Sequence, residues 1–130
     1  MATITITLLS GAVENECADF ALRLSAAALE QGHKINLFLL GKASTLGNKE
    51  IPWSGEKGMQ GELADFMDTF RLAGRVEELA SRGAQIHTCH TTEYARGAEG
   101  CEYLEGVQRG NVGVSLTKFF ITSDVAFTIG

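Results

Sequence analysis

The fold is decided by residues 3–40, which read TITITLLSGAVENECADFALRLSAAALEQGHKINLFLL. Thr3 to Leu9 alternates threonine with isoleucine or leucine and then becomes continuously apolar, which is typical of a strand near the centre of a sheet. A helix is predicted from about Glu14 to Gln31, because acidic residues suit the start of a helix and Gly32 suits its end. Ile35 to Leu40 is predicted to be a second strand. A strand, a helix and a strand in this order predict a parallel pair joined by a right-handed crossover.

The next segment, Gly41 to Gly61, is predicted to be a long surface loop because it contains many glycines and the only proline. Loops of this length inside a domain are commonly lids or interface elements. Trp53 is expected to cover a site, to contact another subunit, or to anchor the loop to the domain. Glu62 to Gly74 and Arg75 to Arg82 have helical patterns, and Gly74 is expected to mark a kink or a break between them.

The remaining elements continue the alternation of strands and helices. Strands are predicted at Ala84 to Thr88, at Tyr103 to Val107 as a short edge strand, and at Val125 to Ile129, with a helix at Val112 to Ile121. The inward residues of that helix are predicted to be Val112, Leu116, Phe119 and Phe120. The chain is therefore predicted to be a single α/β domain spanning residues 1–130, with three α/β/α layers around a mostly parallel sheet of four or five strands.

Composition narrows the class of protein. The chain of 130 residues has a net charge of −5, which argues against a nucleic-acid partner because phosphate binding needs clusters of basic residues. No apolar run approaches the roughly 20 residues of a membrane-spanning helix, and the first residues lack the positive charge of a signal peptide. Three cysteines at irregular spacing predict no disulfide framework, so a cytoplasmic location is expected.

A second stretch, AQIHTCHTTEYARG at residues 84–97, contains a candidate reactive site. Cys89 directly follows a predicted strand, and in parallel α/β sheets reactive groups gather past the carboxyl ends of the strands. The threonines after Cys89 suit a helix start, and a helix N-terminus stabilises a thiolate, the reactive form of cysteine. Cys89 is therefore a candidate nucleophile. The alternative is that it is a small apolar residue at the end of a core strand, which is common for a free cysteine.

Polar neighbours are candidates for tuning this thiol. His90 is the better one, because an imidazolium beside a sulfur favours the thiolate. His87 is expected on the sheet face opposite Ile86, which is also the face of Cys89. Arg96 is expected either to add positive charge or bind an anionic group of a partner, or to be a solvated surface residue.

Two other cysteines and several motifs complete the candidate chemistry. Cys101 is expected to resolve a persulfide or to form a transient disulfide with Cys89, which geometry decides. Cys17 is expected to pack against the sheet from the first helix. The sequence has no CxxC or HExxH metal motif and no glycine-rich phosphate motif after its first strand. Neither a metal nor a cofactor is therefore expected.

Three segments resemble the DsrE/DsrF-like sulfur-relay family, which includes the TusD-type subunits of the tRNA-thiolation relay. They are Ala27 to Phe38, Cys89 to Gly97 and Val112 to Gly130. In family members that carry sulfur, a cysteine ends the third strand and an Arg-Gly pair follows, as Cys89, Arg96 and Gly97 do here. The resemblance covers nearly the whole chain. The segment Gly41 to Gly61 and the cysteine at 101 depart from the simplest pattern.

The resemblance implies a flavodoxin-like fold, assembly into trimers or hexamers, and a persulfide carried on Cys89. We therefore expect a sulfurtransferase-type carrier that passes sulfur between donor and acceptor proteins. Some family members lack the cysteine and serve as structural subunits. A scaffold subunit, in which Cys89 is incidental and the loop with Trp53 makes contacts, is the second hypothesis. A small thiol-redox protein that uses Cys89 and Cys101 is the third.

Overall fold

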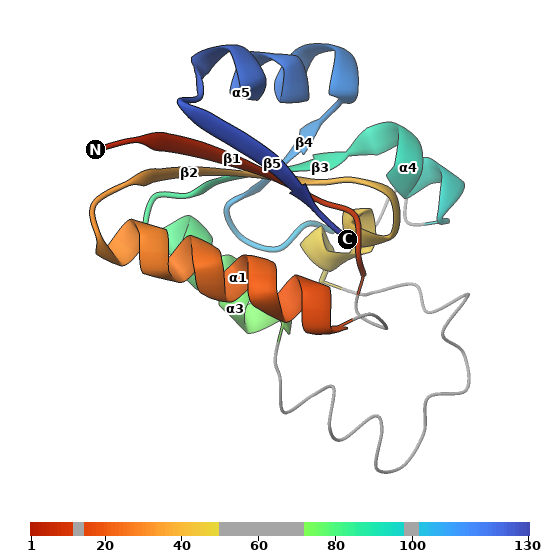
Figure 1. Ribbon diagram of the computed structural model, residues 1–130. Helices are drawn as coiled ribbons and strands as arrows, with labels where there is room; N and C mark the ends of the chain where they lie inside the picture. Colours follow the sequence, from red (N-terminus) through yellow and green to blue (C-terminus); the bar gives the residue numbers. More distant parts are fainter. Residues whose placement is uncertain (12–14, 50–71, 98–101) are drawn as a thin grey trace.

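The structure, a computed structural model, describes residues 1–11, 15–49, 72–97 and 102–130. Within this part of the chain, five parallel strands form one sheet in the order β4-β3-β2-β1-β5 (Figure 1). The strands are β1 (Thr3–Leu8), β2 (Lys34–Leu39), β3 (Gln85–Cys89), β4 (Val107–Gly110) and β5 (Val125–Ile129). The predicted α/β class, with helices on both faces of a parallel sheet, is confirmed.

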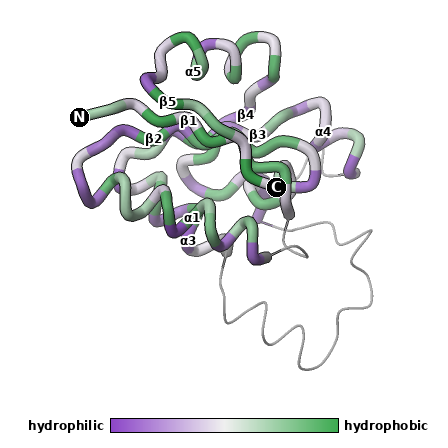
Figure 2. Tube along the Cα trace, in the orientation of Figure 1, coloured by the Kyte–Doolittle hydropathy of each residue, from purple (hydrophilic) through white to green (hydrophobic). Residues whose placement is uncertain are grey.

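The main hydrophobic core lies on one face of the sheet, against α1 (Asn15–Glu30), α3 (Leu72–Ser81) and the 3-10 helix η1 (Gly41–Gly47) (Figure 1). The register of β1 and β2 places Ile6 beside Leu37, and both side chains are fully buried. The helices contribute the buried residues Ala18, Ala21, Leu22, Ala43, Leu46, Val76 and Leu79. Figure 2 shows the hydrophobic residues concentrated along the central strands. Burying each large apolar side chain contributes about 1.5–3 kcal/mol, so most of the folding free energy comes from this face.

In the described part of the chain, the other face is covered by one segment, a turn of π-helix, η2 (Val112–Leu116), followed by α5 (Thr117–Thr122) (Figure 1). The strands β1 to β4 step across the sheet in one direction, so right-handed crossovers place α1 and α3 on the same face. The connection from β4 to β5 runs back in the opposite direction, and a right-handed crossover then has to use the other face. The buried residues under this segment form a small second cluster of Phe38, Cys89, Leu116 and Phe119.

Residues 41–47 do not form the surface loop that their composition predicted. They form η1, in which Ala43, Ser44, Thr45, Leu46 and Gly47 are buried. A side chain at Gly47 would crowd β4, because a Cβ there would lie 3.0 Å from Cγ1 of Val107. The rest of the predicted loop, including Trp53, and the predicted helix over residues 62–71 lie outside the described residues. Gly74 lies inside α3, so no break between helices occurs there.

The edge strand and the last helix also differ from prediction in detail. β4 begins at Val107, where the predicted strand was to end, and Tyr103 instead forms an isolated bridge with Asn48. Leu116 and Phe119 are buried as predicted. Val112 and Phe120 were predicted to face inward, but each is 46% exposed. Among the described helices, none has both the length and the apolar character needed to cross a membrane.

Candidate functional site

Cys89 is the last residue of β3 and directly precedes the short helix α4 (His90–Ala95). It therefore lies at the carboxyl edge of the sheet, beside Gly110 of β4, as the sequence predicted. Thr92 fixes the turn that follows, because its hydroxyl donates to the Cys89 carbonyl at 3.4 Å and accepts from the Gly41 amide at 3.2 Å. The ends of β2 and β3 are thus tied together next to the candidate nucleophile.

The Cys89 side chain is covered rather than open to solvent. The residue is 2% exposed and packs in an apolar cluster with Phe38, Leu116 and Phe119, with Leu40 at its margin. The rings of Phe38 and Phe119 meet edge to face, with centroids 6.5 Å apart. The sequence predicted a reachable sulfur, and in this conformation η2 and α5 seal it, because the crossover from β4 to β5 passes over this face.

His90, the histidine that the sequence favoured, is engaged by Arg109 of β4. Nη2 of Arg109 lies 2.8 Å from Nδ1 of His90 and also contacts Nε2. The contact holds the His90 side chain against β4, since a guanidinium donates to an imidazole nitrogen. Sequence reasoning missed Arg109, because the strand that carries it was placed four residues too early and the contact joins positions far apart in the chain.

His87 lies on the same face of β3 as Cys89, as predicted, because the two residues alternate with Ile86 and Thr88. Its ring packs against Phe119 with centroids 4.8 Å apart. Burial lowers the pKa of His87 below its ordinary value, and the positive charge of Lys118 lowers it further. Its Nδ1 is buried and has no hydrogen-bond partner. His87 is therefore a neutral imidazole at physiological pH, and its Nδ1 makes no hydrogen bond.

Arg96 and Cys17 are not brought to Cys89. Arg96 is exposed at the opposite end of α4 from the thiol. Cys17 is half-buried in α1, which packs on the other face of the sheet from the Cys89 side chain. Cys101 lies outside the described residues, so its predicted pairing with Cys89 stays a prediction.

A buried carboxylate also went unnoticed in the sequence. Glu93 of α4 is 2% exposed and accepts a hydrogen bond of 3.0 Å from the hydroxyl of Tyr103. The contact ties α4 to the segment that leads into β4, next to the bridge between Tyr103 and Asn48. We assign Glu93 to the support of α4, since the donor that it meets is a structural neighbour rather than the thiol.

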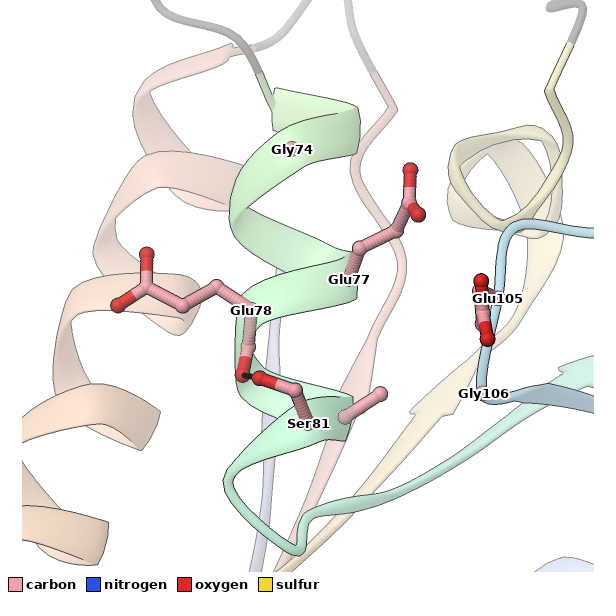
Figure 3. A pocket seen from close by; sticks show the side chains of 7 residues that line it. Gly74, Glu77, Glu78, Ser81, Glu105 and Gly106 are labelled. Atoms are coloured by element: carbon pink, nitrogen blue, oxygen red, sulfur yellow. Dashed lines mark hydrogen bonds between the residues drawn. The ribbon is translucent and has the colours of Figure 1, made fainter.

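An open cavity of about 510 Å³ lies elsewhere, between α3 and the turn before β4. Figure 3 shows Glu77 and Glu105 on opposite sides of it, with Glu78 directed away toward α1. Its carboxylates disfavour an anionic ligand. Within the described part of the chain, no three His, Cys, Asp or Glu residues are grouped so that they could hold a metal ion.

Comparisons with known proteins agree with this architecture. A family model described as the DsrE/DsrF-like family matches residues 3–119. The crystal structure of the ychN protein from E. coli is similar with a TM-score of 0.67, over 98% of this chain and 99% of that chain, at 23% sequence identity. At this identity the similarity shows the fold alone. No curated protein sequence matches the chain.

Proposed function

The chain belongs to the DsrE/DsrF-like family, and from that premise we propose that it is a sulfur-relay protein that carries sulfur as a persulfide on Cys89. One observation supports the choice of residue above the others. Cys89 ends β3 at the carboxyl edge of the sheet, at the turn into α4, where parallel α/β sheets place their chemistry. Persulfide exchange requires reduced thiols, so the proposed activity belongs in a reducing compartment, which we take to be the cytoplasm.

The proposed chemistry is a thiol exchange without a cofactor. The Cys89 thiolate attacks the outer sulfur of a persulfide on the donor protein, and a new sulfur–sulfur bond forms as the donor's own sulfur–sulfur bond breaks. The donor leaves as a thiolate, and Cys89 holds the transferred sulfur. An acceptor thiolate then repeats the same attack on the Cys89 persulfide. No net oxidant or reductant is needed, because the transferred sulfur keeps its oxidation state.

The proposed partners are the donor and acceptor proteins, together with further subunits in a homo- or hetero-oligomeric trimer or hexamer. Exposed apolar side chains support such contacts, since large exposed apolar groups gathered on one segment are typical of interaction surfaces. Those on α4, η2 and α5 are Tyr94, Val112, Val114, Phe120 and Ile121. The η2 and α5 part of this surface covers Cys89, so a partner bound there would contact the cover of the thiol.

A scaffold subunit is the second candidate, and the burial of Cys89 favours it. A sulfur that contacts apolar side chains and is 2% exposed has the surroundings of a structural cysteine. In a scaffold, the thiol would stay sealed and would never gain sulfur. The two functions therefore differ in one measurable property of Cys89.

Sulfur loading tests the proposal directly. The protein is incubated with a small persulfide donor, the excess is removed, and the intact mass and the labile sulfur are measured. We expect the wild type to gain one labile sulfur, Cys89→Ser to gain none at this site, and the matched control Cys17→Ser to behave as the wild type. If Cys89→Ser gains as much labile sulfur as the wild type, the carrier function is wrong. If neither protein gains sulfur even with partner subunits present, the scaffold function is correct.

A further inference from the structure

A thiol and an imidazole, two groups that can exchange a proton, both lie under α5. Cys89 and His87 are two residues apart on one face of β3, which separates their Cα atoms by roughly 6.6 Å. Both pack against Phe119, Cys89 within the second cluster and His87 through its ring. The covering segment therefore packs against both the thiol and the imidazole.

The adjacent histidine is directed elsewhere. His90 belongs to α4, where the backbone has left the strand, and its ring meets the guanidinium of Arg109. The contact joins the His90 ring to β4, whereas the His87 ring packs against Phe119, which also covers Cys89. His90 is thus adjacent to Cys89 in sequence but occupied in the structure.

We propose that His87, and not His90, accepts the proton of the Cys89 thiol during sulfur exchange. His87 offers a buried nitrogen, Nδ1, that has no hydrogen-bond partner. An unpaired polar atom in an apolar space is costly, and such a group is retained where it has a use. A neutral ring can accept a proton at this nitrogen, whereas burial and the charge of Lys118 oppose its protonated form. This inference rests on the carrier function proposed for Cys89.

The proton and electron balance of the step is simple. The S–H bond of Cys89 breaks, its electron pair stays on sulfur, and an N–H bond forms on the His87 ring. The thiolate then attacks the outer sulfur of the donor persulfide, and the departing donor thiolate takes the proton back from His87. The imidazole is neutral again at the end of the exchange, so each transfer of sulfur leaves the site ready for the next.

Two cations lie near this pair: Arg109 contacts His90, the residue after Cys89, and Lys118 acts on His87. Lys118 of α5 is the cation that acts on His87, and it opposes a second positive charge there. The neighbouring strands place Phe38 and Gln108 beside His87, and neither side chain titrates. Transfer of the proton creates a thiolate beside the new imidazolium, and their attraction offsets the effect of Lys118.

The test is the pH dependence of Cys89 alkylation. The rate with iodoacetamide is followed by mass spectrometry of the peptide that contains Cys89, from mildly acid to alkaline pH. The pH at the midpoint of the profile reports formation of the thiolate. Opening of the cover instead multiplies the rate by the same factor at every pH. We expect His87→Gln to raise the midpoint, because the variant lacks the base that takes the thiol proton. We expect the matched variant His90→Gln to leave it in place.

Further variants separate loss of the imidazole from loss of the fold. Phe119→Ala keeps His87 but loosens the cover, so its rate should rise while its midpoint stays at the wild-type value. If His87→Gln does not fold, the imidazole of His87 is titrated by NMR in the wild type and in Cys89→Ser, and a shift in its midpoint between the two is expected. An unchanged midpoint in His87→Gln, or no shift on replacing Cys89, overturns the inference. Sulfur loading is measured separately, so a protein that loads sulfur but fails these tests keeps its function and loses only this assignment.

Discussion

Replacing Phe119 with alanine should expose the Cys89 sulfur without unfolding the sheet. Phe119 is 4% exposed and is one of two buried side chains that η2 and α5 place over the second cluster. A helix as short as α5 is not stable by itself, so its position depends on these side chains. Local opening of such a segment would give reagents a route to the thiol that global unfolding does not require.

The size of the effect follows from the packing. Removing a buried phenylalanine ring costs about 3–5 kcal/mol in a well-packed core, and we take the lower value because Phe119 lies near the surface. Each 1.4 kcal/mol changes an equilibrium about tenfold, so the open population should rise about 100-fold. The alkylation rate of Cys89 at fixed pH should rise by the same factor, because the rate is proportional to the open population.

Matched variants decide whether the opening is local. Leu22→Ala removes a side chain that is 1% exposed from the core on the other face, at a similar cost of about 2–5 kcal/mol. Ile121→Ala removes a side chain of α5 that is 78% exposed. Neither should accelerate alkylation, and the wild-type rate should depend little on low concentrations of urea. Equal acceleration by Leu22→Ala and Phe119→Ala would show that the sulfur is reached only through global unfolding, and the reasoning about the cover would be refuted.

Two other predictions concern stability. Gly106 and Gly32 both have positive φ, but only a Cβ at Gly106 would collide, 2.6 Å from the Cβ of Ala80. Gly106→Ala should therefore destabilise the fold by about 3 kcal/mol and Gly32→Ala by about 1 kcal/mol in urea unfolding, and equal losses would contradict this. Burial lowers the pKa of His87, so the folded state should lose stability as the pH falls from above about 6.5 through the lowered value, since protonation then favours the unfolded chain. His87→Gln should lose less over the same range, and a difference between the two proteins that does not change with pH would speak against this.

The sequence predicted the central strands because their apolar pattern reflects burial directly. β1, β2, β3 and β5 lie within a residue or so of their predicted positions, and Cys89 lies at the predicted strand end. β4 was misplaced because an edge strand of four residues, half of them exposed, leaves little hydrophobic pattern to recognise. Similarly, glycine and lysine in residues 41–47 suggested a surface loop, whereas small residues there allow η1 to pack closely in the core.

The environment of the thiol was less predictable than its position. Val112 and Phe120 were predicted to face inward on the assumption of a regular α-helix from residue 112. This segment instead begins with a π-helical turn, which changes the angle between successive side chains. The pair of His90 and Arg109 joins two elements across the carboxyl edge of the sheet. Such contacts depend on strand order, which local patterns do not encode.

Strand order also explains why the cover of the thiol is thin. The right-handed crossovers from β1 to β4 place α1 and α3 on the face away from Cys89. Among the described segments, only the return from β4 to β5 crosses the face that holds Cys89. That return is short, and its outward side is apolar and exposed at Val114 and Ile121. The topology therefore places the thiol beneath η2 and α5, which also carry exposed apolar side chains that a partner could contact. In a carrier, a partner that binds η2 and α5 would move this segment off Cys89, and the alkylation rate of Cys89 would rise. In a scaffold, the segment would stay in place, and the rate would not rise when the partner subunit is added.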